Sequence, residues 1–475
     1  MSASAIMPRV RAVENMVRRS RQKTRQKPAP PACQTCNIAL WISFFFDGTD
    51  NHKERDFPVR HTNVVALFQA HQFYLERGVR PFYYEGCGTD FEFEDRYERL
   101  YNPHMGVVEL KGHVEEENTF NQSMGRNIDK RLEKALFEFE DYIEGIRRRQ
   151  RVDEINVAAF GFSRGATTAR AFVHWVEAHS KVSKSGGKLK YDGIPLNFKF
   201  LGLYDTVESI GVGTQNNASD VIPTSIPQYV EKLLHVVAAH ELRPSFSLTD
   251  LGRSRAGWST VVYPGAHADI GGGYAANQQA RINAINRIAL LQMLDHARAA
   301  GLKMLSVAEM ISTGDEWELK LRHSFVLSKN AKEIFDNYMS HIDKPSGALP
   351  EVFASHMKWF WKWVDSGLAA EDTGGKFSRY WRAPDKQAAE RRKELVAMSS
   401  AVSQKARTLQ GKGHGALFGK PVHPVTERML PAAVEYVLEN YVHDSQAHFL
   451  MSGTRLIDTN EYDLYRIRKV LAPKS

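Results

Sequence analysis

The sequence lacks long apolar runs, has few cysteines and carries almost no net charge outside its N-terminus. No apolar run reaches the roughly 18 residues of a membrane-spanning helix. The N-terminus also lacks the apolar core of a secretory signal peptide, so we expect neither feature. Three cysteines cannot form a disulfide framework, and Cys33-x-x-Cys36 lacks the second pair that a zinc site needs. We therefore expect ordinary reduced thiols, with a disulfide possible after export, and no metal bound by cysteine.

The net charge of +8 is concentrated at one end of the chain. Residues 1–28 contain eight Lys and Arg residues and one acid, Glu14, which gives +7 and leaves about +1 for the rest. So small a charge gives the remaining chain no footprint for a phosphate backbone, and we expect no nucleic-acid partner. Residues 1–32 end in a proline-rich stretch and are predicted to form a disordered basic arm.

Apolar patterns over residues 33–300 predict an α/β core with a mostly parallel sheet flanked by helices. Aromatic and β-branched runs predict strands at 39–46, 81–86, 155–160, 197–204 and 260–263. Helical spacing of apolar residues predicts helices at 62–75, 128–146, 233–239 and 282–294. The basic, glycine-containing stretch 180–192 is predicted to be a surface loop.

Residues 301–475 are predicted to be a mostly helical addition whose C-terminal part packs back on the core. Its segment 351–365 alternates aromatic residues with lysines. Such a stretch suits the interface between water and lipid, although burial in the core is the alternative. The possible membrane-contact residues are Trp359, Phe360, Trp361 and Trp363.

Ser163 lies in the segment Gly161-Phe162-Ser163-Arg164-Gly165, between a predicted strand and a predicted helix. This is the context of a nucleophile elbow, a sharp turn that exposes a serine hydroxyl above the sheet. Glycines at 161 and 165 are needed because a side chain at either place would collide with the neighbouring strand or helix.

Asp205 and His267 complete the order Ser, Asp, His that serine hydrolases of this architecture show. Each follows a predicted strand, and parallel strands bring their carboxyl ends to one edge of the sheet. We therefore predict a catalytic triad of Ser163, Asp205 and His267. His240 and His443 are rival bases, and Asp269 is a rival or supporting acid that an extended chain would place on the same side as His267.

The loop after the first strand and the residue after the nucleophile are expected to supply the backbone N–H donors of an oxyanion hole. These donors are Arg164, Gly48 and Thr49, with Asp47 in a possible supporting role. The chemistry requires no cofactor. Asp47, Asp50 and Asp90 could alternatively gather around calcium, although their spacing matches no known ligand pattern.

Five blocks, in one order, resemble a known family: FFFDGTDN, GFSRGATTARAF, LGLYDTV, AAHELRPSF and GAHADIGGGY. The chain over 39–280 is similar to type VI secretion lipase effectors built on a former domain of unknown function. The resemblance implies an α/β-hydrolase fold, phospholipase A activity, and a triad at Ser163, Asp205 and His267. The YVHDS segment also looks like the family, which argues for a structural role of His443.

The resemblance further implies a bacterial protein exported without a signal peptide into a neighbouring cell's periplasm. A spike-type carrier protein, a cognate immunity protein and a membrane phospholipid substrate are the expected partners. Two alternatives stay open: an esterase acting on soluble esters, and a non-catalytic module of the same fold that binds lipid or a partner. The residues do not distinguish the A1 from the A2 position.

Overall fold

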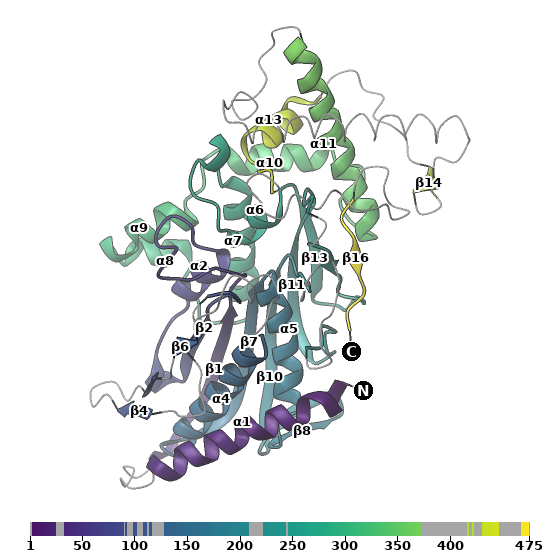
Figure 1. Cartoon of the computed structure of the whole chain (residues 1–475). Helices are drawn as coiled ribbons and strands as arrows, with labels where there is room; N and C mark the ends of the chain where they lie inside the picture. Colours follow the sequence, from purple (N-terminus) through teal and green to yellow (C-terminus); the bar gives the residue numbers. More distant parts are fainter. Residues whose placement is uncertain are drawn as a thin grey trace.

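Parallel strands form the centre of the molecule, in the order β13-β11-β10-β7-β1-β2 (Figure 1). The computed structural model describes residues 2–24, 33–89, 91–92, 98–101, 108–111, 114–115, 128–208, 222–243, 246–372, 416–417, 420–421, 430–445 and 467–474. The six strands are β1 Cys33–Phe46, β2 Val79–Tyr84, β7 Gln150–Phe162, β10 Ile194–Tyr204, β11 Val230–Ala238 and β13 Trp258–Tyr263. The strand order reverses between β1 and β7, where open α/β sheets bind their ligands.

The side chains of the central strands are buried on both faces of the sheet. In β1, Phe44 and Phe46 belong to one apolar cluster and Phe45 belongs to the other. This alternation explains why the run is continuously apolar, since each face is covered by helices. The predicted mostly parallel sheet is therefore confirmed.

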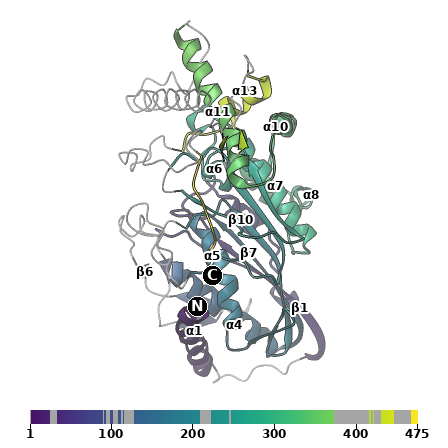
Figure 2. The ribbon, with the colours of Figure 1, turned by 90° about the vertical axis from the view of Figure 1, so that its right-hand side faces the viewer.

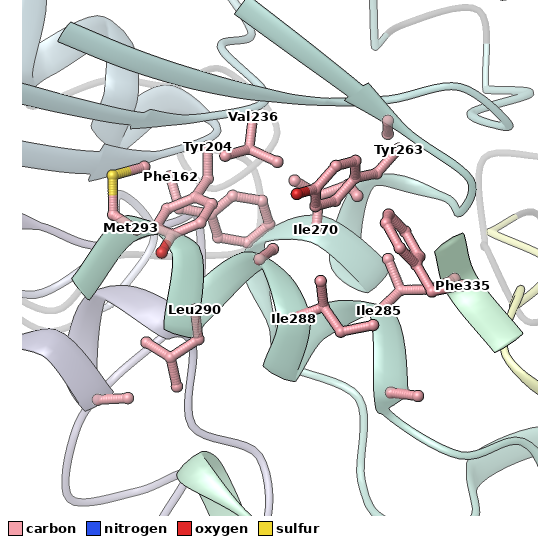
Figure 3. Close-up of a cluster of buried hydrophobic side chains, with 14 of the residues drawn as sticks. Phe162, Tyr204, Val236, Tyr263, Ile270, Ile285, Ile288, Leu290, Met293 and Phe335 are labelled. Carbon is pink, nitrogen blue, oxygen red and sulfur yellow. The ribbon is translucent and has the colours of Figure 1, made fainter. Parts of the chain in front are cut away.

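One face is covered by α1 Ser2–Thr24, α4 Ile128–Arg147 and α5 Arg164–Glu177, and the other by α2 Asn63–Ala70 and α7 Ala284–Ala299. Figure 3 shows part of the second cluster, with Phe162, Tyr204 and Val236 of the sheet near Ile285 and Ile288 of α7. Thr62 begins α2 as its N-cap and accepts a hydrogen bond from the N–H of Val65 at 3.2 Å. The helices predicted at 128–146 and 282–294 are thus present, whereas the one predicted at 62–75 ends at Ala70.

The chain beyond residue 300 contributes helices to the same apolar cluster. They are α8 Val307–Ser312, α10 Ala331–Ser340, α11 Leu349–Asp372 and α13 Ala432–Asn440, of which α10, α11 and α13 lie at the upper end of the view in Figure 1 and α8 lies lower, near α2. The three-residue helix α9 Glu318–Lys320 has no buried residue. The shorter helices are η1 Leu75–Arg77, α6 His267–Gly271, η2 Gln278–Ala280, η3 Asp315–Trp317 and η4 Leu321–Phe325. The minor strands are β3 Phe91–Glu92, β4 Glu98–Tyr101, β5 Val108–Lys111, β6 Val114–Glu115, β12 Leu248–Thr249, β14 Ala416–Leu417, β15 Lys420–Pro421 and β16 Val470–Leu471.

The prediction of a disordered basic arm is wrong for residues 2–24, which form helix α1 against α4 (Figure 2). Val10, Val13 and Val17 recur at helical spacing and are buried. Two of the arginines are paired: Arg9 with two acids of α4, and Arg21 with Asp141. The sequence contains this apolar repeat, but the many basic residues around it favour the prediction of a disordered arm.

Two further predictions of secondary structure are wrong. Residues 230–238, expected to be partly helical, are strand β11, which lies between β13 and β10 in the sheet. A short run that is apolar on both faces cannot be assigned by periodicity, and its β-branched valines were the better guide. Residues 182–191, expected to be a loop, form the hairpin β8 Val182–Ser185 and β9 Lys188–Tyr191, which extends the sheet antiparallel to β10.

The aromatic segment of α11 is part of the core. Trp359, Phe360, Trp361 and Trp363 are between 3 and 7% exposed and belong to the larger apolar cluster. Their proposed contact with a membrane is therefore wrong, because these rings are covered by the protein. Among the described residues, none of the helices has both the length and the apolar character needed to cross a membrane.

Candidate active site

Ser163 lies between the last residue of β7 and the first residue of α5, in a strained conformation with φ 58° and ψ −124°. A Cβ atom on Gly161 would lie 2.3 Å from the carbonyl oxygen of Gly165. A Cβ atom on Gly165 would lie 2.2 Å from the carbonyl oxygen of Phe46. The predicted elbow is therefore present, and its two glycines are required for the reason expected from the sequence.

Asp205 follows β10 and contacts His267, 62 residues further along the chain. The Nδ1 atom of His267 lies 2.5 Å from Oδ2 of Asp205, and both side chains are buried. Burial acts to raise the pKa of the Asp205 carboxyl group, but Arg468 and His267 outweigh it and hold the pKa well below its usual value. The pair thus consists of an ionised carboxylate and an imidazole that the carboxylate orients.

His267 is the first residue of α6, and two aromatic rings enclose its imidazole. Its ring centroid lies 4.5 Å from that of Phe162 and 4.9 Å from that of Phe246. Burial lowers the pKa of His267, against the opposing effect of Asp205. The neutral imidazole, the form that accepts a proton, is therefore favoured at neutral pH.

Backbone hydrogen bonds hold the elbow against the strand that carries Asp205. The N–H of Ser163 donates to the carbonyl of Tyr204 at 3.0 Å, and the N–H of Val207 donates to the carbonyl of Ser163 at 3.3 Å. Among the described residues, no hydrogen bond joins the Ser163 hydroxyl to His267, as is common in sites without substrate. The ring of Phe162, which precedes the serine, packs against the imidazole of His267 at an angle of 32°, so the three predicted residues lie at one edge of the sheet.

The rival residues have other partners. His443 contacts Asp269, with 2.5 Å between Nδ1 and Oδ1, and its backbone N–H donates to the same carboxylate at 2.9 Å. His240 accepts a hydrogen bond from the N–H of Gly265 at 2.9 Å. Asp269 does not point the way of His267, because residues 267–271 are helical and residues two apart on a helix diverge. The expectation from an extended chain is wrong.

The loop after β1 lies directly against the elbow, but one of its predicted donors is already engaged. The N–H of Gly48 donates to Oδ1 of Asp47 at 2.8 Å, so Gly48 does not offer it to a substrate. The N–H of Thr49 makes no hydrogen bond in the described part of the chain, and its hydroxyl accepts from Nε of Arg164 at 2.5 Å. Arg164, the other predicted donor, is the first residue of α5.

Asp47 is buried beneath this loop and accepts two further hydrogen bonds. Tyr83 donates to Oδ2 at 2.6 Å, and Thr62 donates to Oδ1 at 2.7 Å. Burial raises the pKa of Asp47 to about 7, although these donors act to lower it. Asp47 therefore ties the loop to β2 and to the start of α2.

Calcium binding by Asp47, Asp50 and Asp90 stays a prediction. Within the described part of the chain, no three metal-ligating side chains form a group. Asp47 is occupied by its three donors, and the largely exposed Asp50 pairs with Arg55. Asp90 lies outside the described residues.

Two charged residues at the site were not found from the sequence. Arg468 donates from Nη1 to Oδ1 of Asp205 at 2.6 Å, 263 positions away, and no local motif marks it. Glu241 accepts from the backbone N–H of His267 at 3.2 Å, and from Arg243. Burial acts to raise the pKa of Glu241, but Arg243 outweighs this effect and the pKa is lowered to about 2.

The fold is similar to that of a solved structure. A crystal structure of an uncharacterized protein from Pseudomonas aeruginosa matches with a TM-score of 0.54 and 20% identity, over 92% of this chain and 69% of that one. A structure of the Tle1 effector bound to the VgrG spike from the type 6 secretion system has a TM-score of 0.41 and 15% identity, over 69% of this chain and 84% of that one. Among curated proteins, none matches the sequence.

The catalytic core matches a family model. Residues 42–191 and 177–296 match the catalytic domain of Tle1-like phospholipase effectors of type VI secretion. Together these ranges cover more than half of the 475 residues and contain Ser163, Asp205 and His267. The chain therefore belongs to the family of Tle1-like phospholipase effectors of type VI secretion systems.

Proposed function

We propose that the protein is a serine phospholipase A that hydrolyses acyl ester bonds of membrane glycerophospholipids through Ser163, His267 and Asp205. The observation that carries this proposal is the 2.5 Å contact between Asp205 and His267 at the sheet edge that also bears the strained Ser163. An ionised acid, a neutral imidazole and an elbow serine are the three components of this chemistry.

In the proposed reaction, Oγ of Ser163 attacks the ester carbonyl carbon while Nε2 of His267 takes the hydroxyl proton. Asp205 holds the imidazole by its Nδ1–H and stabilises the imidazolium that forms. The backbone N–H groups of Arg164 and Thr49 stabilise the oxyanion. The ester C–O bond then breaks, His267 protonates the departing lysophospholipid, and water attacks the acyl-enzyme to release a fatty acid. No step requires a cofactor.

The biological setting follows from family membership and is also a proposal. The protein acts on a target cell's membrane from the periplasmic side, after export from the producing bacterium by a type VI apparatus. A spike-type protein carries it, and an immunity protein protects the producer. These partners can be tested by co-purification of each candidate with the full chain.

The direct test is fatty-acid release from vesicles of phosphatidylethanolamine and phosphatidylglycerol by wild type and Ser163→Ala. Removing a triad nucleophile lowers kcat by about 10⁴- to 10⁶-fold. Analysis of the lysophospholipid product distinguishes A1 from A2 cleavage. Release that is equal in both proteins would refute the elbow assignment. Activity on soluble esters without any on vesicles would favour an esterase.

A further inference from the structure

The C-terminal segment 467–474 lies along the edge of the fold near β13, where Figure 1 shows β16 in yellow. Its strand β16 pairs in parallel with β12, and Ile467 and Val470 pack against buried residues of β11 and β13. The carbonyl of Lys474 accepts hydrogen bonds from the N–H groups of Thr224 and Ser225 at 2.9 and 2.8 Å. The segment is thus fixed along its length.

Arg468 is the residue of this segment that points inward. Its side chain is 1% exposed, whereas that of its neighbour Lys469 faces solvent. The guanidinium group donates from Nε and Nη2 to the carbonyl of Phe246, at 3.1 and 2.5 Å, and from Nη1 to Asp205. One planar group therefore holds both a backbone loop and a carboxylate, with a fork geometry that a lysine ammonium does not reproduce.

The bond to Arg468 determines how the Asp205 carboxylate is oriented. Oδ1 accepts from Arg468 and from the N–H of Ala238 at 2.9 Å, and this leaves Oδ2 to His267. The same guanidinium fixes the backbone of Phe246, whose ring packs edge-on against the imidazole. Arg468 thus acts on His267 through both the carboxylate and a wall of its pocket.

We propose that Arg468 is a positioning residue for the catalytic acid, and that catalysis therefore requires segment 467–474 in its docked position. Arg468 balances the buried charge of Asp205 and holds Oδ2 toward Nδ1 of His267. The inference rests on the proposed triad, because it assigns Arg468 a role only if Asp205 is the acid of the reaction. Undocking the segment would remove one of the two donors to Oδ1 and leave the negative charge of Asp205 without its arginine partner.

The charges around His267 predict a change in pH dependence. The carboxylates of Asp205 and Glu241 face it from β10 and from the loop after β11, and Arg243 and Arg468 oppose them. Replacing Arg468 by a neutral residue leaves two carboxylates against one arginine, which favours the imidazolium. Activity requires neutral imidazole, so the acid limb of the kcat/KM profile should move to higher pH.

The test compares wild type, Arg468→Met, Arg468→Lys and the control Lys469→Met on phosphatidylethanolamine and phosphatidylglycerol vesicles. Active enzyme is counted with a serine-reactive fluorophosphonate, and kcat/KM is measured across pH. We expect Arg468→Met to lower kcat/KM per active site by about 10- to 100-fold, less than the roughly 10⁴-fold cost of disabling a triad acid. Its acid limb should move up by about one pH unit. Lys469→Met should match wild type.

Arg468→Lys retains the charge but loses the planar fork, so it should lower kcat/KM while leaving the acid limb unmoved. If Arg468→Met does not fold, Arg468→Lys is the deciding variant. A kcat/KM of Arg468→Lys equal to that of wild type would then overturn the inference. A second outcome would also overturn the inference. If the variants contain fewer fluorophosphonate-reactive sites, but each site keeps its kcat/KM and the acid limb of the pH profile does not move, the segment has only a structural role. Wild type that releases no more fatty acid than Ser163→Ala would instead refute the proposed function, and the inference with it.

Discussion

Asp47 should make the folded protein less stable as the pH rises. A salt-bridged aspartate has the opposite effect, because its folded pKa is lowered. The carboxyl group is buried, and it receives hydrogen bonds from Tyr83, Thr62 and the N–H of Gly48. Burial raises its pKa from 3.8 to about 7. The folded protein therefore retains a proton at pH values where the unfolded chain has released it.

The magnitude follows from the two pKa values. Because the folded pKa is the higher one, the stabilising contribution of this group is complete below the unfolded pKa of 3.8 and is lost as the pH rises through about 7. Linkage gives a loss of about 3 kcal/mol in the free energy of unfolding between about pH 5 and about pH 8. In Asp47→Asn this contribution is absent, because an amide does not titrate in this range.

Urea unfolding of wild type and Asp47→Asn at about pH 5 and about pH 8 measures the effect. The stability of wild type relative to the variant should fall by about 3 kcal/mol over this interval. Asp50→Asn is the matched control, since Asp50 lies three residues away in the same loop and is largely exposed. Equal pH dependence of wild type and Asp47→Asn would show that the three donors outweigh burial.

Three further predictions concern the elbow, α1 and α11. Gly165→Ala should cost more than about 3 kcal/mol in urea unfolding, because its Cβ would meet backbone oxygens at 2.2 and 2.3 Å. Gly145→Ala, whose Cβ meets nothing within 4 Å in α4, should stabilise by about 0.5–1 kcal/mol. Val13→Asp should lower the free energy of unfolding by about 3 kcal/mol or more and expose α1 to proteolysis, because Val13 is buried. Ala12→Asp, at an exposed position of the same helix, should do neither, and equal effects of the two variants would contradict a packed helix. Trp361→Ala should lower the free energy of unfolding by about 3–5 kcal/mol, because the ring is buried, and should not selectively reduce binding to vesicles in a flotation assay. Loss of vesicle binding without loss of stability would instead indicate a ring that faces the membrane.

The parts of the site that were predicted from the sequence depend on local rules. Ser163 and its two glycines form one short turn, so their neighbours in space are largely their neighbours in sequence. Asp205 and His267 were predictable because parallel strands bring their exits to one edge. The engagement of the Gly48 N–H by Asp47 is also local, but it depends on a side-chain rotamer that sequence does not specify.

What sequence reasoning missed depends on packing between distant segments. Arg468 reaches Asp205 across 263 positions, and an arginine after an apolar residue looks like any solvated charge. Strand β11 could not be separated from a helix, because burial on both faces removes the alternation that marks a strand. The pairing of α1 with α4 joins residues about 120 positions apart, since Arg9 and Arg21 bind acids of α4 that no local pattern links to them.

Backbone hydrogen bonds to neighbouring strands hold two strained residues at the catalytic edge of the sheet. Ser163 and Asp205 both adopt left-handed backbone conformations, with φ of 58° and 44°, and neither is a glycine. Each such residue costs on the order of 1–3 kcal/mol and persists only where its surroundings hold it. Here the N–H of Ser163 bonds to the carbonyl of Tyr204, and the N–H of Asp205 bonds to the carbonyl of Val236 at 2.8 Å. Each strained residue is therefore fixed by the strand next to its own, so the parallel sheet that brings the two side chains together also holds their backbones in the conformations that chemistry requires.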